Sequence, residues 1–308
     1  MPAEILPQLK NSNFLQKLEI LLQNKDELIK KAQNRVRKNS ERYIFHGWEH
    51  SEYVADKAKE ILRDYLDNNH LELDEKIKSQ LADLIEIAAW YHDVVFGTED
   101  KKDEQLSAAA LILDMRELGT DGDLGKLLRG IISATQVDRA QAAPPNWGGA
   151  STIKQFDGVE DEVVRQNVLA QALAAADLFH FASDFDTSIN FGVRFALETN
   201  SFDKEMSEAS IWFYFVGQVL YYNRYTFPDE FSYFNESKDH NRDLILRLVG
   251  VADVSAAESI VNEVASSKDK QQTVLGLYEF YKNKVNLEKL EEIKETAQEI
   301  KQKHNSQS

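Results

Sequence analysis

Residues 81–96 read LADLIEIAAWYHDVVF, an apolar run that carries an adjacent histidine and aspartate near its end. Apolar residues precede His92 at the spacing of one helix face, namely Leu81, Ile85 and Ala88. This pattern predicts a buried helix from which the side chain of His92 points inward. An unpaired buried carboxylate costs several kcal/mol, so we expect His92 and Asp93 to have partners elsewhere in the chain.

Two further helix-like segments carry a similar residue. His50 lies in HGWEHSEYVADKAKEIL and is followed at helical spacing by Val54, Ala58, Ile61 and Tyr65. Asp177 is the only formally charged residue between Val168 and Ala182. Two imidazoles and two carboxylates that meet in a helical core are most simply explained by a bound divalent metal. The ligands of this predicted site are His50, His92, Asp93 and Asp177.

The composition of the chain describes a folded globular protein. It has 308 residues, of which 43% are hydrophobic, and the length allows one or two domains. Cysteine is absent, which excludes disulfides, Cys-ligated zinc, iron–sulfur clusters and thiol catalysis. The N-terminal residues MPAEILPQLKNSNF contain neither a basic leader nor a hydrophobic signal region, and no apolar stretch approaches the roughly 18 to 20 residues that span a bilayer. We expect a cytoplasmic protein without a membrane partner.

The net charge of −16 bears on the binding partners. A surface of this charge repels polyanions, so extended DNA or RNA is not an expected partner. A small anionic substrate remains compatible with the sequence, because a metal and a few basic side chains can reverse the field locally. The sequence does not indicate the oligomeric state.

Helical periodicity dominates the chain and no convincing alternating strand is present, which predicts an all-α fold. The expected helices lie near residues 12–37, 47–68, 76–96, 103–118, 121–135, 160–184, 187–199, 204–224, 239–249, 253–266 and 270–304. We expect one helical-bundle domain over residues 1–250 and a C-terminal helical extension over 251–308, packed on it. The longest irregular segment, residues 136–158, has two open interpretations, a lid or a plain surface loop.

The order of these residues resembles the HD-domain superfamily of metal-dependent phosphohydrolases, and within it the group described as predicted metal-dependent HD phosphohydrolases. The strings that carry the resemblance span roughly residues 40 to 225 and read ERYIFHGWEHSEYVA, AAWYHDVVF, DEQLSAAA, AADLFHFASDF and GVRFALE. The resemblance implies an HD-type helical bundle that binds a metal through His50, His92, Asp93 and Asp177. It also implies hydrolysis of a small phosphate ester, such as a nucleotide or another phosphometabolite, by water that the metal activates.

His46 lies four residues before His50 and would share its face if one helix ran through both. In the related cyclic-nucleotide phosphodiesterases, a His-Asn-x-x-x-His arrangement supplies a general acid and then a metal ligand. His46 and His50 match these two positions, although Gly47 replaces the asparagine. The resemblance implies that His46 protonates the leaving oxygen; the alternative is a surface or capping histidine.

Glu104 and Ser107 resemble the family's Asn-Glu-x-x-Ser-Ala string, which implies that Glu104 orients a water molecule. The alternative for Glu104 is an acidic residue that the dipole favours at the start of a helix. The candidates for phosphate contact are Arg42, Lys102, Arg129 and Arg194. Arg194 has the alternative of pairing with Glu198 one turn later. His180 lies three residues after Asp177 and is either an extra ligand or outer partner of the metal site, or a core histidine.

Departures from the family pattern limit the prediction to one firmly held ion. Dinuclear HD proteins supply further histidines, whereas this chain offers Gln136 and Asp138. We therefore expect one divalent transition metal, that is Mn, Fe, Ni, Co or Zn, and a second metal is in doubt. An HD oxygenase, which uses two irons, is disfavoured for the same reason. A regulatory protein that binds a nucleotide without turnover stays an alternative.

Overall fold

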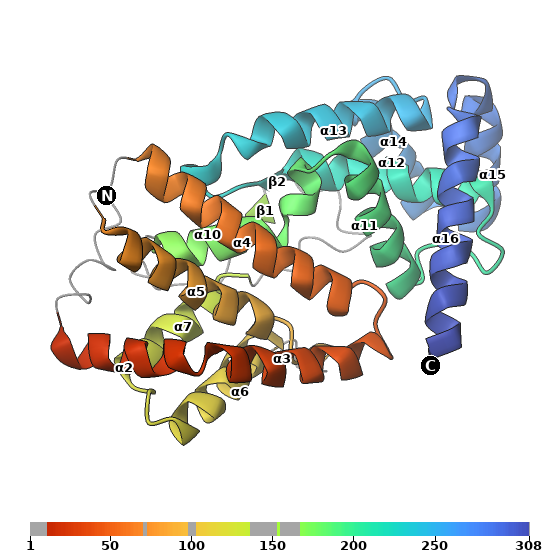
Figure 1. Cartoon of the computed structure of the whole chain (residues 1–308). Coiled ribbons are helices and arrows are strands. Elements are labelled where there is room, and N and C mark those ends of the chain that lie inside the picture. Colours follow the sequence, from red (N-terminus) through yellow and green to blue (C-terminus); the bar gives the residue numbers. More distant parts are fainter. Residues whose placement is uncertain (1–10, 70–72, 98–102, 136–152, 155–166, 308) are drawn as a thin grey trace. The chain divides into compact units, whose positions relative to one another are not determined.

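The computed structural model describes residues 11–69, 73–97, 103–135, 153–154 and 167–307 (Figure 1). These residues form thirteen α-helices, and the predicted all-α fold class is confirmed. The only β pairing among them is a parallel contact of two residues each, between β1 (Ile153–Lys154) and β2 (Tyr225–Thr226). Within the same residues, no helix has both the length and the apolar character needed to cross a bilayer. The predicted loop 136–158 lies outside the described residues except for β1.

The chain divides into two compact units. The first comprises Met1–Val137, Gln155–Phe179 and Pro228–Phe231, and the second comprises Asp138–Lys154, His180–Phe227 and Ser232–Ser308. The helices of the first unit are α2 (Ser12–Gln23), α3 (Lys25–Ser40), α4 (Trp48–Asn68), α5 (Glu75–Tyr91), α6 (Asp103–Glu117), α7 (Asp123–Ser133) and α10 (Val168–Asp177). The sequence-based division at residue 250 stays a prediction.

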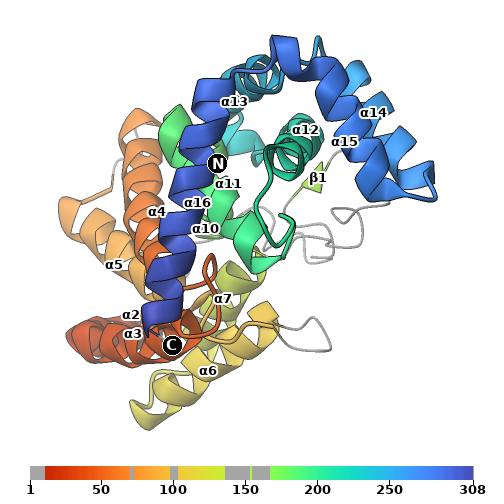
Figure 2. The same ribbon diagram turned by 90° about the vertical axis from the view of Figure 1, so that its right-hand side faces the viewer.

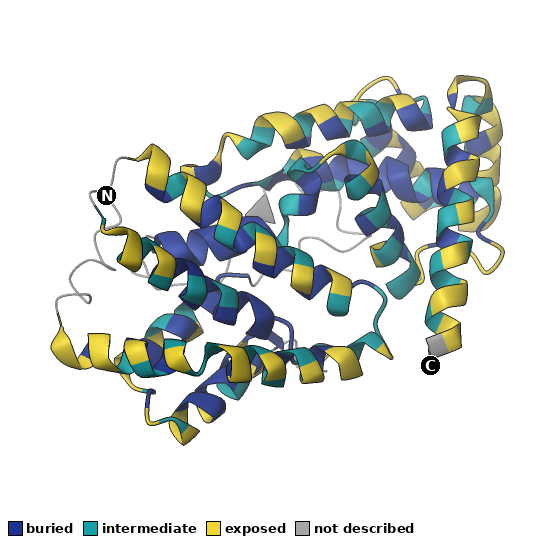
Figure 3. Ribbon diagram, viewed as in Figure 1, coloured by how far each residue is buried: buried dark blue, intermediate teal, exposed yellow. Residues whose placement is uncertain are grey.

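The core of the first unit forms where α4 packs against α5 and α10. Figure 1 shows α4 and α5 side by side, and Figure 3 shows that exposed residues line the outer side of α4. The buried face of α4 repeats at helical spacing and includes Val54, Ala58, Ile61 and Leu62. Nearly all of α10 is buried, and its small alanine side chains allow neighbouring helices to approach closely. Polar residues start these helices: the side chains of Asp74 and Asn167 accept hydrogen bonds from backbone N–H groups of α5 and α10.

The second unit is built around α12 (Glu208–Arg224), whose residues are buried almost throughout. Figure 2 shows α12 surrounded by α13 (Phe234–Val249), α14 (Val254–Ser266) and α15 (Lys270–Tyr281), and these helices contact it. The other α-helices described in this unit are α11 (Phe185–Glu198) and α16 (Leu287–Gln307). The described residues also form the short 3-10 helices η2 (Phe179–Ala182), η3 (Asp229–Phe231) and η4 (Lys282–Lys284), of which η3 belongs to the first unit. Aromatic residues of α12, namely Trp212, Tyr214, Phe215 and Tyr222, are buried in this core.

Three expected helices end or break earlier than their periodicity indicates. Residues 12–37 form α2 and α3, separated at Asn24, whose backbone leaves the helical conformation and whose amide donates to the carbonyl of Ile20 at 2.8 Å. Residues 270–304 form α15 and α16, with η4 and extended Val285 between them. The helix expected over 76–96 is α5, which ends at Tyr91, directly before the His-Asp pair.

A buried carboxylate ties three helices of the first unit together. Asp114 of α6 accepts hydrogen bonds from both terminal nitrogens of Arg35 of α3, at 2.6 and 3.1 Å. The hydroxyl of Tyr91, at the end of α5, donates to the same carboxylate at 2.6 Å. Burial raises the pKa of Asp114, but the bonds from Arg35 and Tyr91 outweigh it, so this pKa lies below its ordinary value. The network places Tyr91 firmly beside His92.

We expect Asp114→Asn to lower the free energy of unfolding at pH 7 by about 1.5–3 kcal/mol, the range for hydrogen bonds to a charged group. Because the folded pKa of Asp114 is lowered, its stabilisation is present above the unfolded value of about 3.9 and is lost as the pH falls through the folded value. The difference between variant and wild type should therefore shrink in acid. Urea unfolding at pH 7 and at pH 3 measures it.

The matched control is Glu117→Gln on the same helix. Glu117 pairs with Lys31 at 2.9 Å, but its side chain is 68% exposed. An exposed pair contributes about 0–1 kcal/mol, so this variant should be close to wild type. Equal losses in the free energy of unfolding for the two variants would show that the network around Asp114 stabilises the fold no more than an exposed ion pair does.

Candidate metal centre

His92 is the residue that caps the C-terminal end of α5, and its ring orientation is fixed from within that helix. Its Nδ1 lies 2.6 Å from the carbonyl oxygen of Ala89, and because a carbonyl only accepts, Nδ1 carries the proton and donates. In the neutral ring the lone pair is then on Nε2, which faces the side chain of His50. A histidine held through its other nitrogen in this way is typical of metal ligands.

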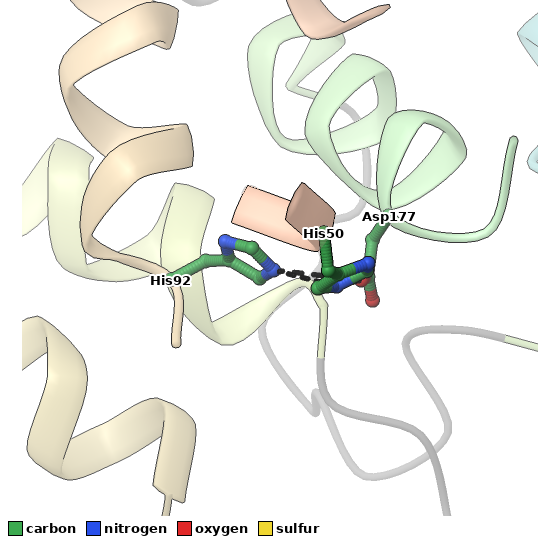
Figure 4. Close-up of side chains that lie close together, drawn as sticks. All are labelled: His50, His92 and Asp177. Carbon is green, nitrogen blue, oxygen red and sulfur yellow. Dashed lines mark hydrogen bonds and ion pairs between the residues drawn. The ribbon is translucent and has the colours of Figure 1, made fainter. Parts of the chain in front are cut away.

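His50 lies in the first turn of α4, and Asp177 is the last residue of α10. Figure 4 shows the side chains of His92 and Asp177 directed toward His50, which lies between them. The Nε2 atoms of the two histidines are 3.3 Å apart. Oδ1 of Asp177 lies 3.2 Å from Nε2 of His50 and 3.5 Å from Nε2 of His92. Both histidine side chains are 1% exposed, and that of Asp177 is 15% exposed.

Asp93 brings a second carboxylate to the same point. Its Oδ2 lies 3.4 Å from Nε2 of His50 and 3.1 Å from Nε2 of His92. The structure thus gathers all four side chains that the sequence singled out as ligands, from the start of one helix and from the ends of two others.

The separations within this group fit one coordination shell. Metal–ligand bonds of about 2.1 Å place neighbouring atoms of a tetrahedral shell about 3.4 Å apart. The five separations given above run from 3.1 to 3.5 Å. His50, His92 and Asp177 form a group that could hold a metal ion, whereas Asp93 lies beside both histidines but is not part of that group. The nitrogen and carboxylate donors suit a divalent transition metal.

The charges of the group compensate one another in the absence of an ion. Burial lowers the pKa of both imidazoles, but Asp93 and Asp177 outweigh it, so the pKa of His50 is raised and that of His92 is raised well above its usual value. Burial raises the pKa of both carboxyl groups, but the imidazoles hold that of Asp93 well below its usual range and that of Asp177 below it. The metal-free group therefore favours imidazolium–carboxylate pairs.

His46 lies beside this group but not on the helix of His50. The α4 helix begins at Trp48 and Gly47 caps it in an extended conformation, so the expected helical register between the two histidines does not exist. The ring of His46 nevertheless lies 5.8 Å from that of His50 and stacks on Phe96, with ring centres 3.6 Å apart. Phe96 belongs to the loop that follows the His-Asp pair. Its contact with His46, which the sequence analysis missed, has no signal in the sequence beyond an aromatic residue in that loop.

Glu104 is buried in the first turn of α6. Two hydrogen bonds connect α6 to the segment after Asp93. The carboxylate of Asp103 accepts from the N–H of Gly97 at 3.1 Å, and the hydroxyl of Ser107 accepts from the N–H of Val95 at 3.0 Å. The water-orienting role of Glu104 stays a prediction.

The predicted phosphate contacts are distributed over the chain. Arg42 is exposed between α3 and α4, its guanidinium 5.7 Å from the ring centre of Tyr43, and Lys102 lies outside the described residues. Arg194 belongs to the second unit, where its Nε donates to Asn190 at 2.9 Å, one turn earlier in α11. Arg129 is exposed in α7, and His180 is buried in the second unit. Their proposed contacts stay predictions.

Comparison of the chain with protein-family models, with curated proteins and with solved structures finds no match. The resemblance to the HD-domain superfamily thus stays a prediction based on the motifs quoted above.

We expect the protein to bind about one divalent transition metal per chain and to release protons near neutral pH when it does so. A metal binds the neutral imidazole, and the pKa of His50 and His92 is raised in the metal-free protein. The apparent affinity should therefore fall as the pH is lowered through these pKa values. Elemental analysis after reconstitution with manganese, iron, nickel or zinc gives the stoichiometry, and calorimetry in buffers of different ionisation enthalpy gives the proton release.

Asp177→Asn removes one ligand and one of the charges that raise the pKa of the imidazoles, so it should bind more weakly and release fewer protons. Asp186→Asn, at an exposed carboxylate of the second unit, is the control and should match wild type. Wild-type protein that takes up no metal would rule out the site. Wild-type affinity in Asp177→Asn would remove Asp177 from the ligand set.

Proposed function

We propose that this chain is a metal-dependent phosphohydrolase of the HD type that acts on a small phosphate ester, such as a nucleotide or another phosphometabolite. One observation carries the proposal: His50, His92 and Asp177 form a group that could hold a metal ion, and a carboxylate oxygen of Asp93 lies within 3.4 Å of both imidazoles. The order of these residues along the chain, His50, then His92 and Asp93, then Asp177, supports the HD assignment.

His50, His92, Asp93 and Asp177 would hold the ion. When bound, a divalent metal supplies Lewis acidity, which makes water more acidic and offsets the negative charge of a phosphoryl group. The ligands contribute rigidity, because each belongs to a helix or to the residues directly beyond its end. His92 is further restrained by its hydrogen bond to Ala89. These four residues supply enough ligands to hold one ion firmly.

His46 is the proposed proton donor to the leaving oxygen. Its side chain is half-buried, and the stacking on Phe96 limits the orientations of the ring. Its ring lies 5.8 Å from that of His50, which supports a role beside the proposed metal and not as a ligand.

Further residues would bind or orient the reactants. Glu104, buried on the helix that is attached to the loop after Asp93, is the proposed acceptor of a hydrogen bond from water. Arg42, Lys102 and Arg194 are the proposed phosphate contacts. A net charge of −16 opposes the approach of an anion, so the substrate must gain most of its attraction from the ion and a few such cations.

The direct test is a panel of phosphomonoesters and phosphodiesters assayed with manganese, iron, nickel, cobalt or zinc. Hydrolysis that needs both the metal and His50 would support the proposal. Metal binding without turnover of any ester would contradict it and would favour the alternative of a regulatory nucleotide-binding protein.

His46→Ala and His50→Ala should separate catalysis from metal binding. His50→Ala should lose metal and activity together. His46→Ala should keep the metal but lose about 100- to 10,000-fold in rate, the usual contribution of general acid–base catalysis. The loss should be smaller for nitrophenyl esters, whose leaving group hardly needs a proton. Metal content and rate, measured on the same preparations, give both quantities.

His240→Ala, at an exposed histidine of α13, is the control for the loss of an imidazole and should behave as wild type. Full activity of His46→Ala on an ester with a poor leaving group would exclude the proton-donor role. Complete loss of metal from His46→Ala would instead identify His46 as a ligand.

A further inference from the structure

The backbone directly after α5 leaves its regular hydrogen-bonding pattern. The helix ends at Tyr91, and the N–H groups of His92 and Val94 reach the carbonyls three residues back at 3.4 Å. Carbonyls at the end of a helix have no partner within it and need donors from elsewhere. Asp93, a proposed metal ligand, lies directly after the end of α5. A group that donates a hydrogen bond to its backbone carbonyl therefore also restrains the position of this residue.

Asn39 supplies that donor. Its side-chain amide nitrogen lies 3.1 Å from the carbonyl oxygen of Asp93 and 3.2 Å from that of Val94. Asn39 is the penultimate residue of α3, and the backbone N–H groups of Arg42 and Tyr43 both donate to its carbonyl at 2.8 Å. These bonds restrain the backbone of Asn39 at the end of α3. Its side-chain amide can therefore restrain the two carbonyls that it contacts.

Side chains also hold the residues that follow. The carbonyl of Val95 accepts from the hydroxyl of Ser107 at 3.2 Å, and that of Phe96 accepts from the hydroxyl of Tyr43 at 3.3 Å. Four consecutive carbonyls, from residue 93 to residue 96, therefore accept hydrogen bonds from side chains. Among the side chains that the structure describes, Asn39 is the one that donates to the carbonyl of Asp93 itself.

We propose that Asn39 is a positioning residue of the metal centre, which acts on the ion through Asp93. The inference rests on the metal site of the proposed function but not on turnover. It concerns Asp93 and not His92, because the ring of His92 has its own restraint in the bond from Nδ1 to Ala89. Without the Asn39 amide, the turn after α5 can relax and Oδ2 of Asp93 can move out of the coordination shell.

A purely structural role for Asn39 would give a different result, and the chain contains a suitable control. Asn241, in the second unit, donates in the same way to two carbonyls, those of Phe181 at 2.9 Å and Ser183 at 2.8 Å. Removing either amide should lower the melting temperature. Only the loss of Asn39 should change the binding of a metal.

The experiment titrates the full-length protein with cobalt(II) alone and follows the visible absorption of the bound ion. Asn39→Ala should bind cobalt about 10- to 100-fold more weakly than wild type, the usual effect of losing an outer partner of a metal ligand. Asn39→Asp, nearly identical in shape, should lose at least as much, because its carboxylate faces two carbonyl oxygens. The absorption spectrum should change in both variants. Asn241→Ala should keep the affinity and the spectrum of wild type.

A double-mutant cycle with Asp93 tests the path of the effect. In an Asp93→Ala background, Asn39→Ala should change the cobalt affinity by no more than about twofold, because the residue through which it acts is gone. The same 10- to 100-fold loss in that background would overturn the inference. So would wild-type affinity and an unchanged spectrum in Asn39→Ala. Wild-type protein that binds no cobalt would overturn both the metal site and this inference.

A substitute variant and a separate hydrolysis assay complete the experiment. If Asn39→Ala does not fold, Asn39→Ser, which retains one donor, serves in its place and should show a smaller loss of affinity in the same direction. Hydrolysis is assayed separately on wild type. Cobalt binding without hydrolysis would contradict the phosphohydrolase proposal, while the affinities of the Asn39 variants would still decide the positioning role.

Discussion

Burial of four ionisable side chains at one point is the constraint on which the first unit depends. His50 and His92 are almost completely inaccessible, and Asp93 and Asp177 are nearly so. Removing one partner from a buried charge pair costs about 3–5 kcal/mol, comparable to the whole margin of stability of many domains. The start of α4 and the ends of α5 and α10 must therefore meet, whatever else the helices do. An ion at this point satisfies the same four groups without their protons.

The sequence predicted the parts of this arrangement that follow from periodicity. Val54, Ala58 and Ile61 define the buried face of α4, and this face correctly placed His50 on the inner side of that helix. What periodicity could not predict is where a helix stops. The helical pattern runs through Asn24, yet its side chain competes for backbone groups and ends α2. Contacts between distant residues, such as His46 with Phe96, depend on loops whose conformations leave no repeating signal.

The end of α5 is the most consequential of these missed boundaries. Successive residues of a regular helix point about 100° apart, so the directions of His92 and Asp93 depend on where the helix ends. Because the regular helix stops at Tyr91, both residues lie in a turn, and both reach the ring of His50. A tight turn at this place leaves carbonyls that need external donors. Side chains supply these donors for residues 93–96, and Asn39 supplies the one for Asp93.

Helix direction also influences the charge balance at the centre. His92 caps the C-terminal end of α5 and Asp177 ends α10, so the negative ends of two helix dipoles are directed at the site. His50 lies at the opposite, positive end of α4. Each dipole contributes only about 0.3–1 kcal/mol near the surface, whereas the buried carboxylates interact with a cation far more strongly. The dipoles therefore bias the site toward a cation, but the carboxylates decide it. By this order of magnitudes, the buried carboxylates would determine whether this group holds a cation, more than the helix dipoles would.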